Sequence, residues 1–156
     1  MKVQPHLNFE GRCEEALDFY RRALGAEVTA LMRFKDSPEP AMILPGSENK
    51  VMYSSFRVGD AIMLAADGRC QGQTNFQGIS LALTVPNEAA AEQRFAALSD
   101  GGQVQSPLAE TFFSPRFGIV ADRFGVTWTV LVQFNAARWV RRTLATGGFW
   151  KHKRIR

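Results

Sequence analysis

The sequence has few of the residues from which disulfide frameworks and thiolate metal clusters are built. Only two cysteines, Cys13 and Cys70, occur in 156 residues, too few for a disulfide-stapled domain or a cysteine-ligated zinc cluster. No apolar run approaches the roughly 18 residues that a membrane-spanning helix needs. The first residues also lack the hydrophobic region of a signal peptide. We therefore expect a cytoplasmic protein with one globular domain, the usual length of which is about 100–200 residues.

Glycine-rich phosphate-binding motifs are absent as well. The sequence has no G-x-G-x-x-G fingerprint, no Walker Gly-Lys-Ser/Thr loop and no G-x-S-x-G nucleophile elbow. These absences argue against a dinucleotide-binding fold, a P-loop nucleotidase and an α/β-hydrolase.

Positive charge is concentrated at the end of the chain. Residues 134–156 contain seven Lys or Arg and no acidic residue, which leaves residues 1–133 with 12 basic and 15 acidic side chains. An acidic body does not fit a nucleic-acid-binding domain, in which the basic surface lies on the fold itself. We expect residues 134–156 to form a basic C-terminal extension, helical in part, that docks on the body or on a partner subunit. Polyanion or membrane binding through this extension is the alternative.

The two halves of the chain share a weak repeat at an offset of 76 residues. In each half a phenylalanine, Phe19 or Phe95, is followed by a glycine six residues later and by a valine nine residues later. The residue pattern of each half also predicts a strand, then a helix, then three strands. We therefore expect one domain over residues 1–133, made of two βαβββ modules at about 1–70 and 76–133.

Hydrophobic periodicity predicts the elements of each module. Apolar residues at helical spacing predict a helix over residues 13–24, which Gly25 ends. Asn87 is the expected N-cap of a second, alanine-rich helix. Strands are expected at residues 3–9, 27–34, 51–58, 61–65, 79–85, 103–113, 117–122 and 126–132.

Several sequence phrases, combined with this order of elements, carry a family resemblance. They are found at residues 7–11 (LNFEG), 15–20 (EALDFY), 24–26 (LGA), 58–67 (VGDAIMLAAD), 110–112 (ETF) and 117–128. The chain resembles the vicinal oxygen chelate superfamily (glyoxalases, bleomycin-resistance proteins and extradiol dioxygenases), and most of all its PhnB-like, or demethylubiquinone methyltransferase-like, branch. The resemblance implies an α+β fold in which curled mixed sheets surround a small-molecule cavity, commonly in a homodimer. A methyltransferase would need a glycine-rich nucleotide loop, so we do not expect that activity.

The resemblance also places four metal-ligand positions, which metal-dependent members fill with His and Glu. One lies early in the first strand of each module, and the other lies in the last strand, four residues after the turn glycine. In this sequence the four positions are Gln4, Met63, Ser80 and Thr129. A shift of one residue would substitute Pro5, Leu64, Leu81 and Val130. Fe, Ni, Mn and Zn need anionic or imidazole donors, so we expect no metal and no other cofactor.

Two polar residues flank the first of these positions. His6 and Asn8 should share a face with Gln4, because alternate residues of a strand point to the same side. His6 can contact a ligand or act as a general base, or it can be a hydrogen-bonded structural residue. Tyr53 stands where the branch often has a histidine, and it suits either gripping a ligand or filling the core.

The second half supplies an acidic and an aromatic candidate. Glu110 lies in a largely apolar stretch near the expected pocket rim, either as a half-buried base or as a solvated charge. Phe112, with Phe113, Phe117 and Trp128, lines an apolar pocket or belongs to the core.

These observations predict a small-molecule-binding protein of the glyoxalase/bleomycin-resistance type. The expected pocket residues are Gln4, His6, Asn8, Tyr53, Met63, Ser80, Phe112 and Thr129. A homodimer is expected because each curled sheet leaves edges and an apolar face uncovered. Whether a reaction is catalysed stays open: an enzyme of lyase, isomerase or oxygenase type would use His6, Tyr53 or Glu110. Nucleic-acid or membrane contact through residues 134–156 is not expected.

Overall fold

Two modules of the same topology make up the part of the protein that the structure describes. The computed structural model describes residues 1–39, 43, 45–70 and 72–133. The extension expected at residues 134–156 lies outside the described residues. In chain order, the elements are β1 (His6–Asn8), α1 (Cys13–Leu24), β2 (Glu27–Arg33), η1 (Phe34–Asp36), β3 (Val51–Val58), β4 (Ala61–Ala66), β5 (Ser80–Val85), α2 (Glu88–Ser99), β6 (Gln103–Ala109), β7 (Phe117–Ala121) and β8 (Thr127–Val132).

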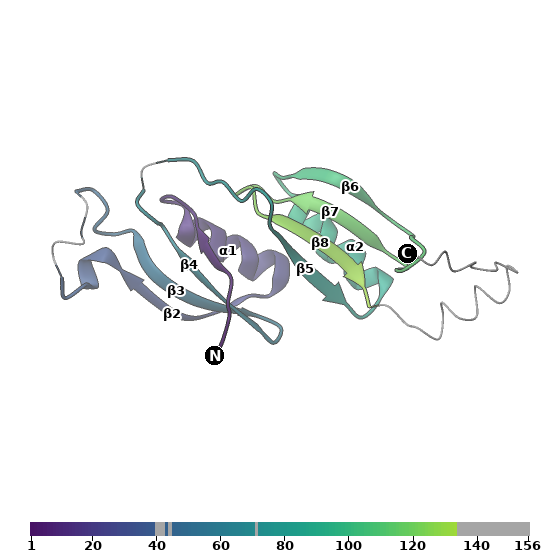
Figure 1. Ribbon diagram of the computed structural model, residues 1–156, viewed down its shortest axis with the longest axis horizontal. Coiled ribbons are helices and arrows are strands. Elements are labelled where there is room, and N and C mark those ends of the chain that lie inside the picture. The colour runs from purple at the N-terminus through teal and green to yellow at the C-terminus, as the bar shows by residue number, and fades with distance from the viewer. Residues whose placement is uncertain (40–42, 44, 71, 134–156) are drawn as a thin grey trace, which may run out of the picture.

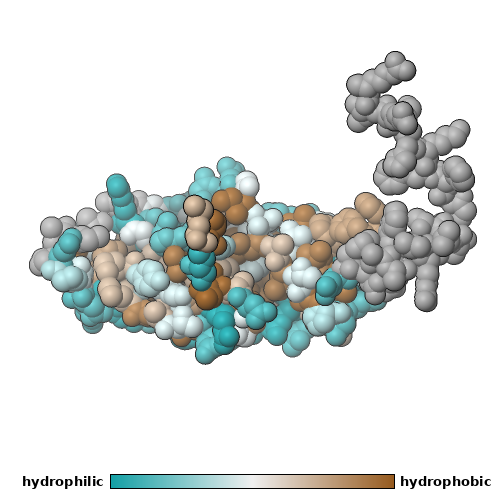
Figure 2. All heavy atoms as spheres, turned by 60° about the horizontal axis from the view of Figure 1, so that its bottom comes forward, coloured by the Kyte–Doolittle hydropathy of each residue, from teal (hydrophilic) through white to brown (hydrophobic). Residues whose placement is uncertain are grey.

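Each module folds into a four-stranded mixed sheet. The strand order is β1-β4-β3-β2 in the first sheet and β5-β8-β7-β6 in the second. In both, the first strand of the module pairs in parallel with the last strand, and the other pairs are antiparallel. The two sheets lie side by side along the long axis of an elongated molecule (Figure 1, Figure 2). The predicted tandem βαβββ fold is therefore confirmed.

One end of each helix is set by a capping residue. α1 ends at Gly25, which adopts a left-handed conformation (φ 69°) and donates its backbone N–H to Arg21. α2 begins after Asn87, whose side chain accepts a hydrogen bond from the backbone N–H of Ala90 at 2.8 Å. Each helix has 12 residues, and neither is long and apolar enough to cross a membrane.

Two strands are shorter than the sequence pattern predicts by more than one residue. The first expected strand covers residues 3–9, but only His6–Asn8 is paired in β1. The sixth was expected to reach residue 113, but β6 ends at Ala109. A turn between Thr111 and Ser114 interrupts it, because the Thr111 N–H donates to the Ser114 carbonyl at 2.9 Å.

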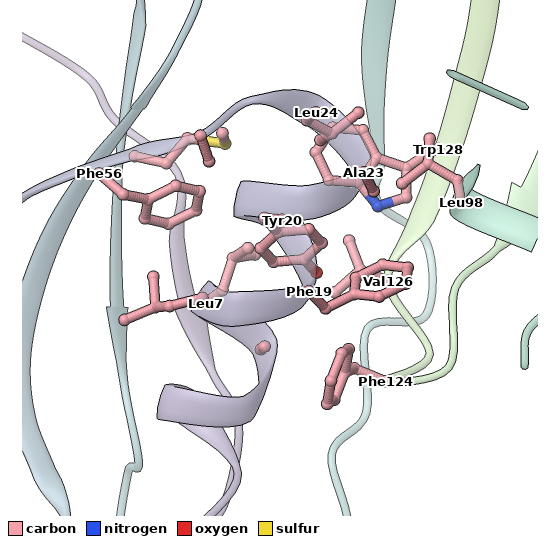
Figure 3. Close-up of a cluster of buried hydrophobic side chains, with 14 of the residues drawn as sticks. Leu7, Phe19, Tyr20, Ala23, Leu24, Phe56, Leu98, Phe124, Val126 and Trp128 are labelled. Carbon is pink, nitrogen blue, oxygen red and sulfur yellow. The ribbon is translucent and has the colours of Figure 1, made fainter. Parts of the chain in front are cut away.

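One hydrophobic core joins the two modules. Tyr20 of α1 lies between Phe56 of the first sheet and Phe124 and Trp128 of the second module (Figure 3). Its hydroxyl donates a 2.8 Å hydrogen bond to Asp122, 102 residues away in sequence. The same carboxylate accepts hydrogen bonds from the indole N–H of Trp128 and from two backbone N–H groups. The modules are thus joined by packing and by a buried polar contact.

A second buried aspartate fixes the start of α1. Asp67, which follows β4 and is 1% exposed, accepts hydrogen bonds from the backbone N–H of Cys13 at 2.6 Å and of Val51 at 2.7 Å. A carboxylate at a helix N-terminus satisfies backbone donors that have no partner within the helix. The helix is therefore held in a fixed position over the first sheet.

Candidate functional site

The two sheets each have one face that the helices do not cover, and we call these the outer faces. In the first sheet, alternate residues such as Ser54 and Phe56 are buried beneath α1. The residues between them point the other way, because side chains of a strand alternate between faces. The first outer face carries His6, Asn8, Met32, Tyr53, Ser55, Arg57, Ile62 and Leu64.

Cross-strand pairing brings three of the predicted site residues onto this first outer face. His6 pairs with Leu64 of β4, which pairs in turn with Ser55 of β3. Tyr53 of β3 pairs with Met32 of β2. His6, Asn8 and Tyr53 are all exposed to solvent, with Tyr53 at 40%. Gln4 precedes β1 and uses its side-chain amide to donate to the Ile62 carbonyl at 3.3 Å.

The second outer face carries two further predicted residues. Ser80 of β5 and Thr129 of β8 point to the same side, and their hydroxyl oxygens are 3.5 Å apart. The strand pairing places the following residues on this face: Ser80, Ala82, Thr84, Gln103, Ser106, Ala109, Phe117, Ile119, Ala121, Thr127, Thr129 and Leu131. Beside it is an open hollow of about 350 Å³, lined by Ser80, Thr127, Gln105 and residues 76–79.

Met63 is not brought together with the other predicted site residues. It is 4% exposed and belongs to the hydrophobic core, on the opposite side of β4 from Leu64. Counting four residues from each turn glycine fails because the turns differ in length. Val58 pairs with Ala61 across a two-residue turn, whereas Ala121 pairs with Thr127 across five residues. Leu64 therefore holds the place in the first sheet that Thr129 holds in the second.

The last two predicted residues lie beyond the end of β6. Glu110 and Phe112 are exposed, Phe112 at 81%. The ring of Phe112 packs edge-on against Phe113 at 5.0 Å, and Phe113 packs edge-on against Phe117 at 5.1 Å. Trp128, the other aromatic candidate, is 2% exposed and belongs to the core.

The sequence interpretation missed several outward-facing polar side chains. Ser55, Thr84 and Thr127 point outward on β3, β5 and β8. Thr127 could have been found from Thr129, because residues two apart on a strand share a face. Both buried aspartates were also missed.

Burial changes the acidity of several groups behind the outer faces. It raises the pKa of Asp122, although hydrogen bonds from Trp128, Tyr20 and the backbone act in the opposite direction. Burial and the neighbouring Asp122 carboxylate raise the pKa of the Tyr20 phenol well above its usual value. Burial also raises the pKa of the Cys13 thiol to about 12. None of these groups lies on an outer face, so we assign them to the framework rather than to the site.

Comparison with known proteins identifies the family. The model of the 3-demethylubiquinone-9 3-methyltransferase family matches residues 1–131. The chain belongs to this family. Among solved structures, it is similar to protein PA1353 from Pseudomonas aeruginosa, with 38% identity, a TM-score of 0.76, and 86% of this chain and 99% of that chain covered.

Two further structures relate this family member to a wider fold. The putative 3-demethylubiquinone-9 3-methyltransferase, PhnB protein, from Bacillus cereus is 27% identical, with a TM-score of 0.72 over 85% of this chain and 100% of that chain. The fosfomycin resistance protein FosX from Listeria monocytogenes, solved with Mn(II) and 1S,2S-dihydroxypropylphosphonic acid, is 11% identical. Its TM-score is 0.62 over 90% of this chain and 98% of that chain, a likeness of fold alone. The family match and the likeness to the PhnB protein, together with the shared fold, make this protein a PhnB-like member of the vicinal oxygen chelate superfamily.

The residues of this PhnB-like chain do not fit the metal that metal-dependent members of the superfamily hold. The four positions are occupied by Gln4, Leu64, Ser80 and Thr129, once the register of β4 is taken from the pairing. These side chains offer one amide, two hydroxyls and an aliphatic group, whereas Fe, Mn, Ni and Zn sites are built from imidazole, carboxylate or thiolate donors. Within the described ranges, no group of three or more His, Cys, Asp and Glu is placed to hold a metal ion.

Proposed function

We propose that the protein binds a small, partly apolar organic molecule on its outer faces, without a tightly bound divalent metal. The observation that carries this proposal is the mixed character of the first outer face. Tyr53 and Met32, each 40% exposed, are paired on β3 and β2, and the same face carries the polar side chains of His6 and Asn8 on β1, on the far side of β4. Ligand sites typically combine apolar lining with a few polar groups that orient the ligand.

We further propose that a second copy of the chain completes the site. The two sheets lie side by side rather than face to face (Figure 1), so neither outer face covers the other within one chain. Figure 2 shows hydrophobic residues gathered in the middle of one side of the molecule, interrupted by hydrophilic ones. In a homodimer, the second outer face of one copy would cover the first outer face of its partner and enclose the ligand between them.

Calorimetry on hits from a thermal-shift screen of a chemically diverse small-molecule library tests the binding proposal. We expect at least one compound to raise the melting temperature, and Tyr53→Ala to weaken its binding roughly tenfold. Leu31→Ala is the matched control, because Leu31 is also 40% exposed but is paired with the inward-facing Ser54. A screen without hits, or hits whose affinity Tyr53→Ala leaves unchanged, would contradict the proposal.

Elemental analysis tests the metal-free part of the proposal separately. The protein should be purified without an affinity metal, and we expect Fe, Mn, Ni and Zn far below one ion per chain. Near-stoichiometric metal would show that donors other than Gln4, Leu64, Ser80 and Thr129 form a site.

The positions of the catalytic candidates support binding more than catalysis. His6 and Tyr53 share the first outer face, but β4 separates their strands. Glu110 follows β6 in the other module. General acid–base catalysis needs groups within hydrogen-bond reach of one reacting centre, and these three residues are dispersed within a single chain. Polyanion binding through residues 134–156 stays the alternative that we do not expect, and those residues lie outside the described part of the chain.

A further inference from the structure

We propose that the ligand of this site is an uncharged molecule that carries an aromatic ring, and that the second outer face selects for these properties. The inference rests on the proposed function and names the chemical class that the same site takes. It is carried by the chemistry of the outward-facing positions of β5 to β8 and by the aromatic side chains at one end of this sheet.

The outward-facing positions of the second sheet carry no charge. Every outward residue of β5, β6, β7 and β8 is a Ser, Thr, Gln, Ala, Ile, Leu or Phe. The arginines nearest to these strands form ion pairs with acidic residues of α2 and of the segment that follows it. Arg116 forms ion pairs with Glu88 and Glu92 of α2 at 3.2 and 3.3 Å, and Arg123 pairs with Asp100 after the same helix.

A charge-free face disfavours an ionised ligand. Removing a carboxylate or phosphate from water is costly unless a cation or several donors replace its hydration. The first outer face carries the ion pair Arg57–Glu27, whose opposite charges are 2.5 Å apart and offset each other. It also carries His6. Uncharged ligands avoid this cost and are therefore selected.

The aromatic end of the second outer face favours a ring. Phe117 lies on this face between Leu131 and Ala109. From it, the edge-on contacts through Phe113 lead to Phe112, which is 81% exposed. Aromatic pairs gain about 0.5–1.5 kcal/mol beyond the area they bury.

The backbone that carries Phe112 is held in place by its neighbours. Ser114, which is 2% exposed, donates its hydroxyl hydrogen bond to the carbonyls of Arg116 and Val132, at 2.6 and 3.0 Å. The Ser114 N–H in turn donates to the Thr111 hydroxyl at 3.0 Å. An exposed ring on an ordered turn loses little conformational entropy when a second ring packs against it.

Hydroxyl groups further along the sheet suit the polar groups of an uncharged ligand. Ser80 and Thr129 are within 3.5 Å of each other, and Thr127 lies beside Ser80 on the paired strand. A hydroxyl can both donate and accept a hydrogen bond. The matching ligand is therefore an aromatic ring that bears hydroxyl or carbonyl groups and no ionised group.

Two probes that share a naphthyl ring, one uncharged and one carrying an anionic phosphate group, test the inference. Calorimetry with the full chain at about pH 7 and about 0.15 M salt, which screens exposed charges, compares 1-naphthol with 1-naphthyl phosphate. We expect 1-naphthol to bind roughly tenfold or more tightly than its phosphate. Phe112→Ala should weaken the binding of 1-naphthol severalfold. Val104→Ala is the control, because Val104 is 46% exposed but is paired with the inward-facing Val120.

A charge placed on the face provides an independent test. Thr129→Lys should reverse the preference and favour 1-naphthyl phosphate, and Thr84→Lys, at an exposed edge position, does the same if the first variant fails to fold. Equal or tighter binding of the phosphate by the unmodified chain, through a site sensitive to Phe112→Ala, would overturn the inference.

The two proposals fail in different ways. If neither probe binds, but the screen yields a ligand that depends on Tyr53, the proposed function stands and the ligand class assigned here is wrong. An anionic screening hit whose binding depends on Tyr53 would likewise overturn the assigned class alone. If the screen and both probes give nothing, both proposals are wrong.

Discussion

The hydrogen bond between Tyr20 and Asp122 is the residue-scale feature on which the packing of the two modules depends. Asp122 is 4% exposed and Tyr20 is fully buried, so loss of the carboxylate would leave the Tyr20 hydroxyl unsatisfied, and loss of the hydroxyl would take one donor from the buried carboxylate. Such groups are costly in a protein interior, because the lost hydrogen bond to water is not replaced.

Tyr20→Phe tests this contact and keeps the ring packing with Phe56. We expect the free energy of unfolding to fall by about 1.5–3 kcal/mol, the usual range for a hydrogen bond to a charged group. The matched control is Tyr53→Phe at the only other tyrosine, whose exposed hydroxyl should change stability by less than about 0.5 kcal/mol. Urea denaturation measures both, and equal effects would show that the buried hydroxyl is not important.

The destabilisation caused by Tyr20→Phe should depend on pH. Burial raises the folded-state pKa of Asp122, and the Tyr20 hydroxyl partly offsets this rise. The protonated form is therefore favoured on folding, and this contribution to stability is present below the unfolded pKa of about 3.9 and is lost as pH rises through the folded pKa. Tyr20→Phe raises the folded pKa further, so its destabilisation should be larger at about pH 7 than near pH 4. A pH-independent difference would contradict this reasoning.

The two cysteines should differ in reactivity. Cys13 is fully buried and burial raises its pKa to about 12, so almost no thiolate, the reactive form, is present. We expect dithionitrobenzoate at about pH 8 to label Cys70 slowly in the native protein and to label both residues in denaturant. Cys70→Ser should abolish native labelling, and rapid labelling of that variant would contradict the burial of Cys13.

Residue roles could be predicted from the sequence only in part. The outward positions of His6, Asn8 and Tyr53 follow from strand alternation, which is local. The burial of Asp122 does not, because its partner Tyr20 is 102 residues away. In its local context, Asp122 before Arg123-Phe124-Gly125 reads as an ordinary turn residue.

At the scale of elements, the packing of α2 onto the second sheet depends on one small residue. Gly118 of β7 lies directly beneath the helix, where an added Cβ would come within 2.7 Å of the Phe95 ring and 3.0 Å of the Leu108 backbone. The helix can approach the sheet this closely because no side chain stands between them.

Gly118→Ala is therefore expected to destabilise the protein by about 1–3 kcal/mol, the typical cost of overpacking. Gly72→Ala is the control, because a Cβ there has nothing within 4 Å, and its effect should be within about 0.5 kcal/mol. Urea midpoints compare the two variants. A Gly118→Ala variant as stable as the parent would show that α2 can move away from the sheet at no cost.

Element types were predictable from the sequence, and element registers were not. The helix at Cys13–Leu24 follows from its apolar stripe and from Gly25. The position of Met63 was misplaced because the turn at Gly59 has two residues and the turn at Gly125 has five. A shift of one residue moves a strand side chain to the other face, so this small difference decides which residue reaches the site.

At the scale of the whole molecule, uncovered apolar side chains on the first outer face predict self-association. We expect light scattering to show a dimer across micromolar concentrations. Met32→Glu should weaken the dimer roughly tenfold or more, because it places an unpaired charge in the proposed contact. Leu31→Glu is the control, with the same 40% exposure but a position paired with the inward-facing Ser54. A monomer at every concentration would contradict the dimer.

Because the chain is synthesised from its N-terminus, the contact between α1 and the second module forms late. The ribosome releases α1 and the whole first sheet before Asp122, Phe124 and Trp128, the residues that cover Tyr20, have been synthesised. Protein synthesis proceeds at about 5–20 residues per second, so several seconds pass between the synthesis of Tyr20 and that of these partners. During that interval the nascent first module exposes one side of its helix, and such transiently exposed hydrophobic surface is prone to aggregation.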